Sequence, residues 1–189
     1  MSVAYSTEFD ADATSIRTVV RDNTGKRIVM AGFPGLSISF DGSGYIDPEA
    51  LGLTLETLTA LGVRTLVVHA EEHELPEGAF DDLKGVAKNL DLTLIFFPIE
   101  DFSVPGDEAL RHWATLGPAL HQILDTGQTL AVSCQFGAGR SGLMAALLLI
   151  ERGLEPNEAI ALIRRHYSKA IENKKQENWL IGQGKSVTV

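Results

Sequence analysis

The stretch "TLAVSCQFGAGRSGLMAALLLIERG", residues 129–153, predicts a buried strand, a glycine-rich loop and a helix in direct succession. Residues 129–134 form a continuous apolar run, which favours a strand covered on both faces. Residues 141–152 are apolar nearly all round, which indicates a central buried helix, and Gly153 follows where such a helix ends. Backbone N–H groups at this junction can surround an anion at the positive end of the helix dipole. The sequence therefore predicts an anion-binding loop over residues 134–140, which we call the cradle loop.

Alternating apolar runs and helical patterns in the rest of the chain predict an α/β fold. Further strands are expected over residues 27–33, 63–70 and 92–99, and helices over 47–61, 79–90, 107–124 and from Pro156 onward. Continuous rather than alternating apolar strands favour a central parallel-rich sheet flanked by helices in a single domain. We predict an N-terminal extension over 1–26 with an edge strand, a main domain over 27–182 and a flexible tail over 183–189.

Charge and cysteine content narrow the function classes. The net charge of -9 argues against a broad surface for nucleic acid or anionic membranes, which needs clustered Lys and Arg. The N-terminus lacks the basic and apolar regions of a secretory signal, and the longest apolar run, 143–150, is too short to span a bilayer. We therefore expect a soluble, cytoplasmic protein. Its single cysteine, Cys134, excludes an internal disulfide and multi-cysteine zinc sites.

The cradle loop fits two motifs with incompatible functions. Gly137, Gly139 and Gly142 have the G-x-G-x-x-G spacing of a dinucleotide-binding turn, whereas Cys134 and Arg140 have the C-x5-R spacing of a nucleophile and a phosphate-binding arginine. A dinucleotide site needs a following strand that ends in an acidic residue about 20 residues on. The sequence places a second helix there. It therefore favours phosphate chemistry, with no cofactor.

The residue types in the loop suit attack on phosphorus. The helix N-terminus and Arg140 both favour the thiolate form of Cys134, which is the nucleophilic form. The Arg140 guanidinium can donate two parallel hydrogen bonds to phosphate oxygens, a geometry that lysine cannot supply. The expected phosphate-binding residues are those of the loop itself: Gln135, Phe136, Gly137, Ala138, Gly139 and Arg140.

Two segments resemble those of a known family. "SCQFGAGRSG", residues 133–142, resembles the signature loop of the cysteine-dependent protein tyrosine and dual-specificity phosphatases, and "FFPIEDFSVP", residues 96–105, resembles their general-acid loop. The resemblance runs from about Arg27 to Leu180 and is closest to the kinase-associated phosphatase type. It implies the compact fold of the dual-specificity enzymes.

By this resemblance, Cys134 is the nucleophile, Arg140 the phosphate clamp, and Asp101 the acid that protonates the leaving oxygen. Ser141 is expected to hydrogen-bond the thiolate and to help release the phosphocysteine. Gln176 resembles a downstream glutamine that positions the hydrolytic water, although a residue of this kind is equally expected on an exposed helix face.

Three features of the sequence leave alternatives open. Glu100 is the nearest rival to Asp101, and only one of two adjacent residues in an extended loop is expected to face the thiol. Ser133 replaces the histidine that the family usually carries before its nucleophile, so we expect a less reactive thiol. "HAEEH", residues 69–73, fits a zinc-peptidase pattern, but His69 ends a strand-like run rather than lying on a helix, so no metal is expected.

The sequence thus predicts a phosphomonoesterase that acts without metal on phosphotyrosine or phosphoserine/threonine in proteins. Inositol phosphates or other small phosphoesters are the second hypothesis, which the absence of lysine from the cradle loop disfavours. The third is a weakly catalytic phosphate-binding module, which Ser133 alone favours.

Overall fold

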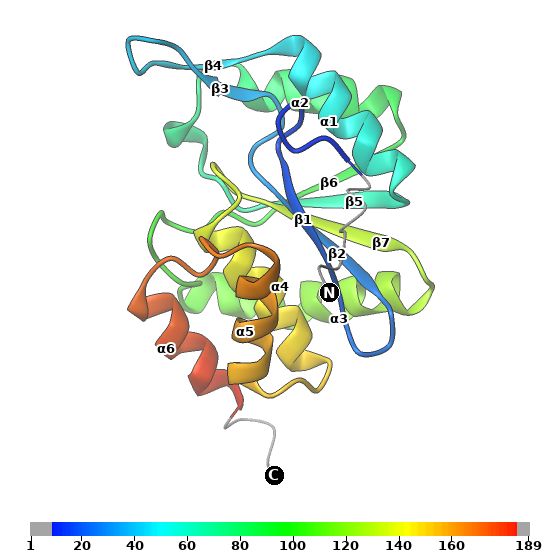
Figure 1. Cartoon of the computed structure of the whole chain (residues 1–189), viewed down its shortest axis with the longest axis vertical. Helices are drawn as coiled ribbons and strands as arrows, with labels where there is room; N and C mark the ends of the chain where they lie inside the picture. The colour runs from blue at the N-terminus through cyan, green and yellow to red at the C-terminus, as the bar shows by residue number, and fades with distance from the viewer. Residues whose placement is uncertain (1–8, 185–189) are drawn as a thin grey trace, which may run out of the picture.

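The structure is a computed structural model that describes residues 9–184. A central sheet lies between two layers of helices (Figure 1). The strands are β1 Ile16–Arg21, β2 Arg27–Ala31, β3 Leu36–Ile38, β4 Gly44–Ile46, β5 Val63–Val68, β6 Thr93–Phe96 and β7 Thr129–Ser133. The helices are α1 Pro48–Ala60, α2 Ala79–Asn89, α3 Asp107–Asp125, α4 Gly139–Glu151, α5 Pro156–His166 and α6 Lys174–Gln183, with a short 3₁₀ helix, η1, at Glu72–Glu74.

The central sheet has the strand order β1-β2-β7-β5-β6. Strands β2, β7, β5 and β6 are parallel, and β1 pairs with β2 antiparallel as an edge strand. This arrangement confirms the predicted parallel-rich α/β fold. Because β7 lies between β2 and β5, the loop that follows it emerges in the middle of the sheet, where neighbouring loops can surround it.

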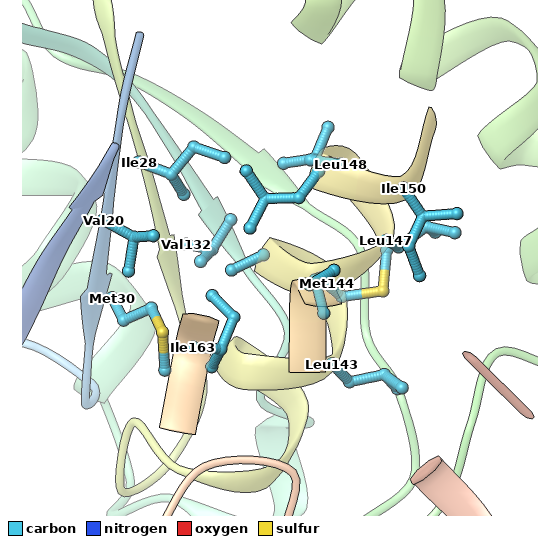
Figure 2. Packing of buried hydrophobic residues seen from close by; sticks show 14 of the residues in the cluster. Val20, Ile28, Met30, Val132, Leu143, Met144, Leu147, Leu148, Ile150 and Ile163 are labelled. Carbon is cyan, nitrogen blue, oxygen red and sulfur yellow. The ribbon is translucent and has the colours of Figure 1, made fainter. Parts of the chain in front are cut away.

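Helices cover both faces of the sheet. Helices α1 and α2 pack on one face, and α3 to α6 pack on the other (Figure 1). Helix α4 is the centre of the second layer, because every residue from Gly139 to Ile150 is buried. Figure 2 shows Leu148 of this helix on the side of Ile28 of β2 and Val132 of β7, in the same buried cluster. The predicted central helix is therefore confirmed, and its packing fixes the end that carries the cradle loop.

Several boundaries differ from the predicted ones. The strand expected over 92–99 ends at Phe96, yet the Phe97 and Ile99 N–H groups still donate to carbonyls of β5 and of the residue after it, at 2.9 and 3.0 Å. The segment from 97 to 106, which we call the acid loop, is therefore hydrogen-bonded at its start to the end of β5 and to His69.

The sequence did not indicate the β3–β4 hairpin, which projects beyond α1 and α2 in Figure 1.

The predicted domain limits stay predictions. Strand β1 lies within the predicted extension over 1–26, but it is hydrogen-bonded into the same sheet as the main domain. Most of the predicted tail, 183–189, lies outside the described residues, and Gln183 still belongs to α6.

Candidate active site

The cradle loop joins the end of β7 to the first turn of α4. Ala138 is the N-cap residue of α4, and no side chain caps this helix end. Its first N–H groups are therefore available to an anion. Gly137 has φ +78, and a Cβ atom there would lie 2.5 Å from the Gly32 nitrogen. Only glycine fits this position, because the backbone is left-handed and touches the end of β2.

Cys134 lies at the base of the loop with only 3% of its surface exposed. The Gly137 N–H donates to its sulfur at 3.3 Å, so the loop itself stabilises negative charge on the thiol. The Ser141 hydroxyl donates to the Ala31 carbonyl at 3.1 Å, and the Cys134 N–H donates to the same carbonyl at 3.3 Å. The expected contact of Ser141 with the thiolate is therefore replaced here by an anchor to β2, and its part in phosphocysteine release stays a prediction.

Arg140 is buried beside the loop, 2% exposed. Its Nη1 donates to both carboxylate oxygens of Glu74, at 2.7 and 3.0 Å, and to the Ile99 carbonyl at 3.0 Å. Its Nη2 lies 3.1 Å from Oδ1 of Asp101. Its Nε has no hydrogen-bond partner among residues 9–184. A buried guanidinium N–H without a partner is costly, so this group indicates a place for a ligand oxygen.

Glu74, in η1, is a site residue that sequence reasoning missed. Its carboxylate holds Arg140 and also accepts the Glu71 N–H at 3.1 Å, while its carbonyl accepts Nε2 of Gln135 at 2.8 Å. The "HAEEH" segment, at which no metal is expected, therefore leads into η1, where Glu74 positions the Arg140 guanidinium. Within the described part of the chain, no cluster of His, Cys, Asp and Glu side chains is arranged to hold a metal ion.

The acid loop places Asp101 at the arginine. Its carboxylate is partly exposed and pairs with Arg140, whereas Glu100 is exposed at the preceding position. Of these two adjacent residues, Asp101 is the one whose carboxylate reaches Arg140. Its role as the acid stays a prediction.

Gln176 is fully buried, so its interpretation as an exposed helix residue is wrong. Its Oε1 accepts the Glu172 N–H at 3.0 Å, and its Nε2 donates to the Ser103 carbonyl at 3.3 Å. Asn173, the N-cap residue of α6, donates to the Phe102 carbonyl at 3.0 Å. The Gln176 amide thus joins the acid loop, at Ser103, to the segment before α6, at Glu172. Its water-positioning role stays a prediction.

His69, directly after β5, is a second buried group that the sequence did not assign to the site. Its Nδ1 bonds to the Phe97 carbonyl at 2.9 Å, which requires the proton on Nδ1, and its Nε2 has no partner within the described residues. Burial lowers the pKa of His69 to about 4, and the charge of Arg140 acts in the same direction against the Phe97 hydrogen bond. The ring is therefore neutral at neutral pH.

The rim of the cradle is partly aromatic. Phe136 of the cradle loop and Phe102 of the acid loop expose 52% and 62% of their surface. The Phe136 carbonyl is held by Nε of Arg17, from β1, at 3.0 Å. Phe136 is a predicted phosphate-binding residue through its backbone, and its ring lies exposed at the rim of the cradle loop.

A family model described as the Swiss Army Knife protein DSP-PTPase phosphatase domain matches residues 47–180. The chain belongs to this family. The matched part contains the cradle loop, the acid loop, η1 and the first part of α6. The residues that contact Arg140, which are Glu74, Ile99 and Asp101, therefore all lie within this DSP-PTPase domain.

Curated relatives agree with this assignment. Over 83 residues, the DSP-PTPase chain is 34% identical to protein tyrosine phosphatase type IVA 3 of Mus musculus, which covers 44% of this chain and 47% of the relative. A probable protein tyrosine phosphatase type IVA A of Dictyostelium discoideum is 32% identical over 84 residues, or 44% of this chain and 49% of the relative. The matches thus span about half the length of these curated relatives.

The fold is that of solved phosphatase structures. Kinase-associated phosphatase with its catalytic cysteine replaced by serine aligns with a TM-score of 0.74 and 21% identity, over 92% of this chain and 96% of that one. PTPMT1 in complex with PI(5)P aligns with a TM-score of 0.61 and 20% identity, over 85% of this chain and 92% of that one. The predicted dual-specificity-phosphatase-like fold is confirmed.

Proposed function

We propose that this protein hydrolyses phosphate monoesters through a phosphocysteine on Cys134. The observation that carries this proposal is the convergence of three groups: a buried thiol that accepts a loop N–H, a buried arginine with an unpartnered Nε, and Asp101 at that arginine. Membership of the DSP-PTPase family supports the same reaction and implies phosphorylated substrates.

The reaction has two steps. In the first, the Cys134 sulfur bonds to phosphorus as the bond from phosphorus to the leaving oxygen breaks, and Asp101 gives that oxygen a proton. Arg140 binds two of the phosphoryl oxygens while charge spreads over them. In the second step, a water oxygen bonds to phosphorus, its proton passes to Asp101, and the electron pair of the S–P bond returns to Cys134.

We further propose that the substrates are phosphotyrosine or phosphoserine/threonine residues of proteins in the cytoplasm, with neither nucleic acid nor membrane as a partner. The curated relatives are protein tyrosine phosphatases by name, which supports protein substrates. Inositol phosphates are less suited, because the cradle loop has no lysine to neutralise several phosphates. No helix within residues 9–184 is long and apolar enough to cross a membrane.

Hydrolysis of p-nitrophenyl phosphate tests the reaction. Cys134→Ser should lower turnover by more than about a thousandfold, because a hydroxyl is a far weaker nucleophile than a thiolate. Arg140→Lys should also lower turnover strongly, because lysine cannot bind two phosphoryl oxygens in the same plane. Arg165→Lys is the matched control, since Arg165 is exposed on α5. Unchanged turnover in Cys134→Ser would refute the phosphocysteine mechanism. Phosphate binding without turnover in the unmodified protein would instead favour a phosphate-binding module.

A further inference from the structure

Glu172 lies at the edge of the cradle loop, in the segment between α5 and α6. A Cβ atom on Gly139 would collide with Oε1 of Glu172, so the carboxylate occupies the space that the glycine leaves free at the first turn of α4. This is the same helix end whose N–H groups lack a side-chain cap. The cradle therefore has a carboxylate at the end that is suited to an anion.

Hydrogen bonds hold Glu172 in this position. Its N–H donates to the fully buried Gln176, whose amide in turn donates to the acid loop at Ser103. Its neighbour Asn173 donates to Phe102 of the same loop. In Figure 1, the orange segment before α6 and the green acid loop lie on the same side of the sheet as the yellow cradle loop. Glu172 is thus tied at its backbone to the acid loop and touches the cradle with its side chain.

The charged groups that act on Glu172 are Asp101 of the acid loop and Arg140 of α4. Burial raises the pKa of Glu172, the charge of Asp101 raises it further, and Arg140 lowers it. The lysines next to Glu172 are engaged elsewhere: Lys174 pairs with Glu177 at 3.0 Å, and Lys175 donates to the Ser103 hydroxyl at 2.8 Å.

The site therefore combines a phosphate-binding arginine with several carboxylates, which carry the same sign of charge as a phosphate. Three carboxylates, those of Glu74, Asp101 and Glu172, interact electrostatically with Arg140. Glu74 and Asp101 pair with the guanidinium directly, whereas the Glu172 carboxylate lies against Gly139 of the cradle loop. Meanwhile the unpartnered Nε of Arg140 indicates an anionic ligand. Arg140 can bind a dianionic phosphate, but the carboxylate of Glu172 repels that phosphate. A positively charged group on the substrate would offset this repulsion.

We propose that Glu172 is a specificity-determining residue that selects phosphopeptides with a basic residue next to the phosphorylated one. An adjacent Arg or Lys side chain offsets the charge of the Glu172 carboxylate and donates hydrogen bonds to it, whereas a flanking Glu adds repulsion. The proposal rests on the proposed function for the identity of the ligand as a phosphoester. It goes beyond that function in naming the sequence around the phosphate.

Peptide binding to the Cys134→Ser protein tests the inference apart from catalysis. Two phosphotyrosine peptides are compared, identical except for Arg or Glu on both sides of the phosphotyrosine. We expect the Arg peptide to bind more tightly, and Glu172→Gln in the same background to reduce the ratio of the two affinities about three- to fivefold, the range of one partly exposed charge contact. Glu158→Gln is the matched control, because it removes the same charge from an exposed position beyond the far end of α4.

Each outcome separates the two proposals. An unchanged affinity ratio in Glu172→Gln overturns the specificity role, as does an equal gain for both peptides, which would mean repulsion without selection. If the ratio falls but the unmodified protein hydrolyses neither peptide, the specificity role stands and the proposed hydrolysis fails. If Cys134→Ser binds neither peptide, the specificity role is refuted, whereas hydrolysis of p-nitrophenyl phosphate by the unmodified protein would leave the proposed reaction standing.

Discussion

Lowering the pH from 7 to 5 should destabilise this protein through His69. The ring is fully buried and its pKa is lowered from 6.5 to about 4, because protonation would place a charge in an apolar site beside Arg140. Between these two pKa values the unfolded chain binds a proton that the native protein does not. Stability therefore falls as the pH drops through this window and is fully present above it.

The magnitude follows from the position of pH 5 in that window. This pH lies about 1.5 units below the pKa of the unfolded ring, and each unit corresponds to about 1.4 kcal/mol of unfolding free energy. We expect His69 to account for about 2 kcal/mol of stability lost between pH 7 and pH 5. This is a large fraction of the net stability of a typical domain.

Urea unfolding at pH 7 and pH 5 measures this loss in the unmodified protein and in His69→Asn. The asparagine amide can reproduce the Nδ1–H donation to the Phe97 carbonyl but does not titrate. Other groups titrate in both proteins, so the difference between their pH responses isolates His69. His73→Asn is the control, because His73 is exposed in the adjacent η1. Equal losses of stability in the unmodified protein and in His69→Asn would refute the argument.

Further predictions concern the catalytic groups. Asp101→Asn should lower turnover most for alkyl phosphates, whose leaving oxygen needs a proton, and least for p-nitrophenyl phosphate; equal losses would remove Asp101 from the acid role. Glu74→Gln should raise KM more than it lowers kcat, because it loosens the guanidinium of Arg140 without removing it; an unchanged KM would argue against this positioning role. Ser133→His should let iodoacetate inactivate Cys134 at lower pH, and an unchanged pH profile would contradict the expected effect of Ser133.

The strand, cradle loop and helix over residues 129–153 could be predicted because their signals are local. Apolar runs of strand and helix length and glycines at the turn are all visible within 25 residues. The spacing of Cys134 and Arg140 is local in the same way. Asp101 lies farther along the chain, and it was found through the resemblance of its loop to a known family, since a loop aspartate has no periodic signal of its own.

The residues that surround Arg140 could not be predicted by the same reasoning. Glu74 and Glu172 are single carboxylates in polar segments, with the composition of ordinary surface loops. The position of His69 is that of a polar strand end, and Gln176 is indicated only by the family resemblance, since its residue type fits an exposed helix face equally well. In each case the signal is a contact and not a pattern, so neither hydrophobic period nor motif spacing reveals it.

By itself, the sequence determined that this protein has a strand, a glycine-rich loop and a buried helix in succession, with a thiol and an arginine at the ends of that loop. Neighbouring residues in one chain set those features through backbone geometry and burial. Only the tertiary structure decided the charge around them. The parallel sheet brings the ends of β5, β6 and β7 to one edge, so Glu74 reaches Arg140 across 66 positions of sequence. Electrostatic interaction depends on distance in space, and the fold alone sets that distance.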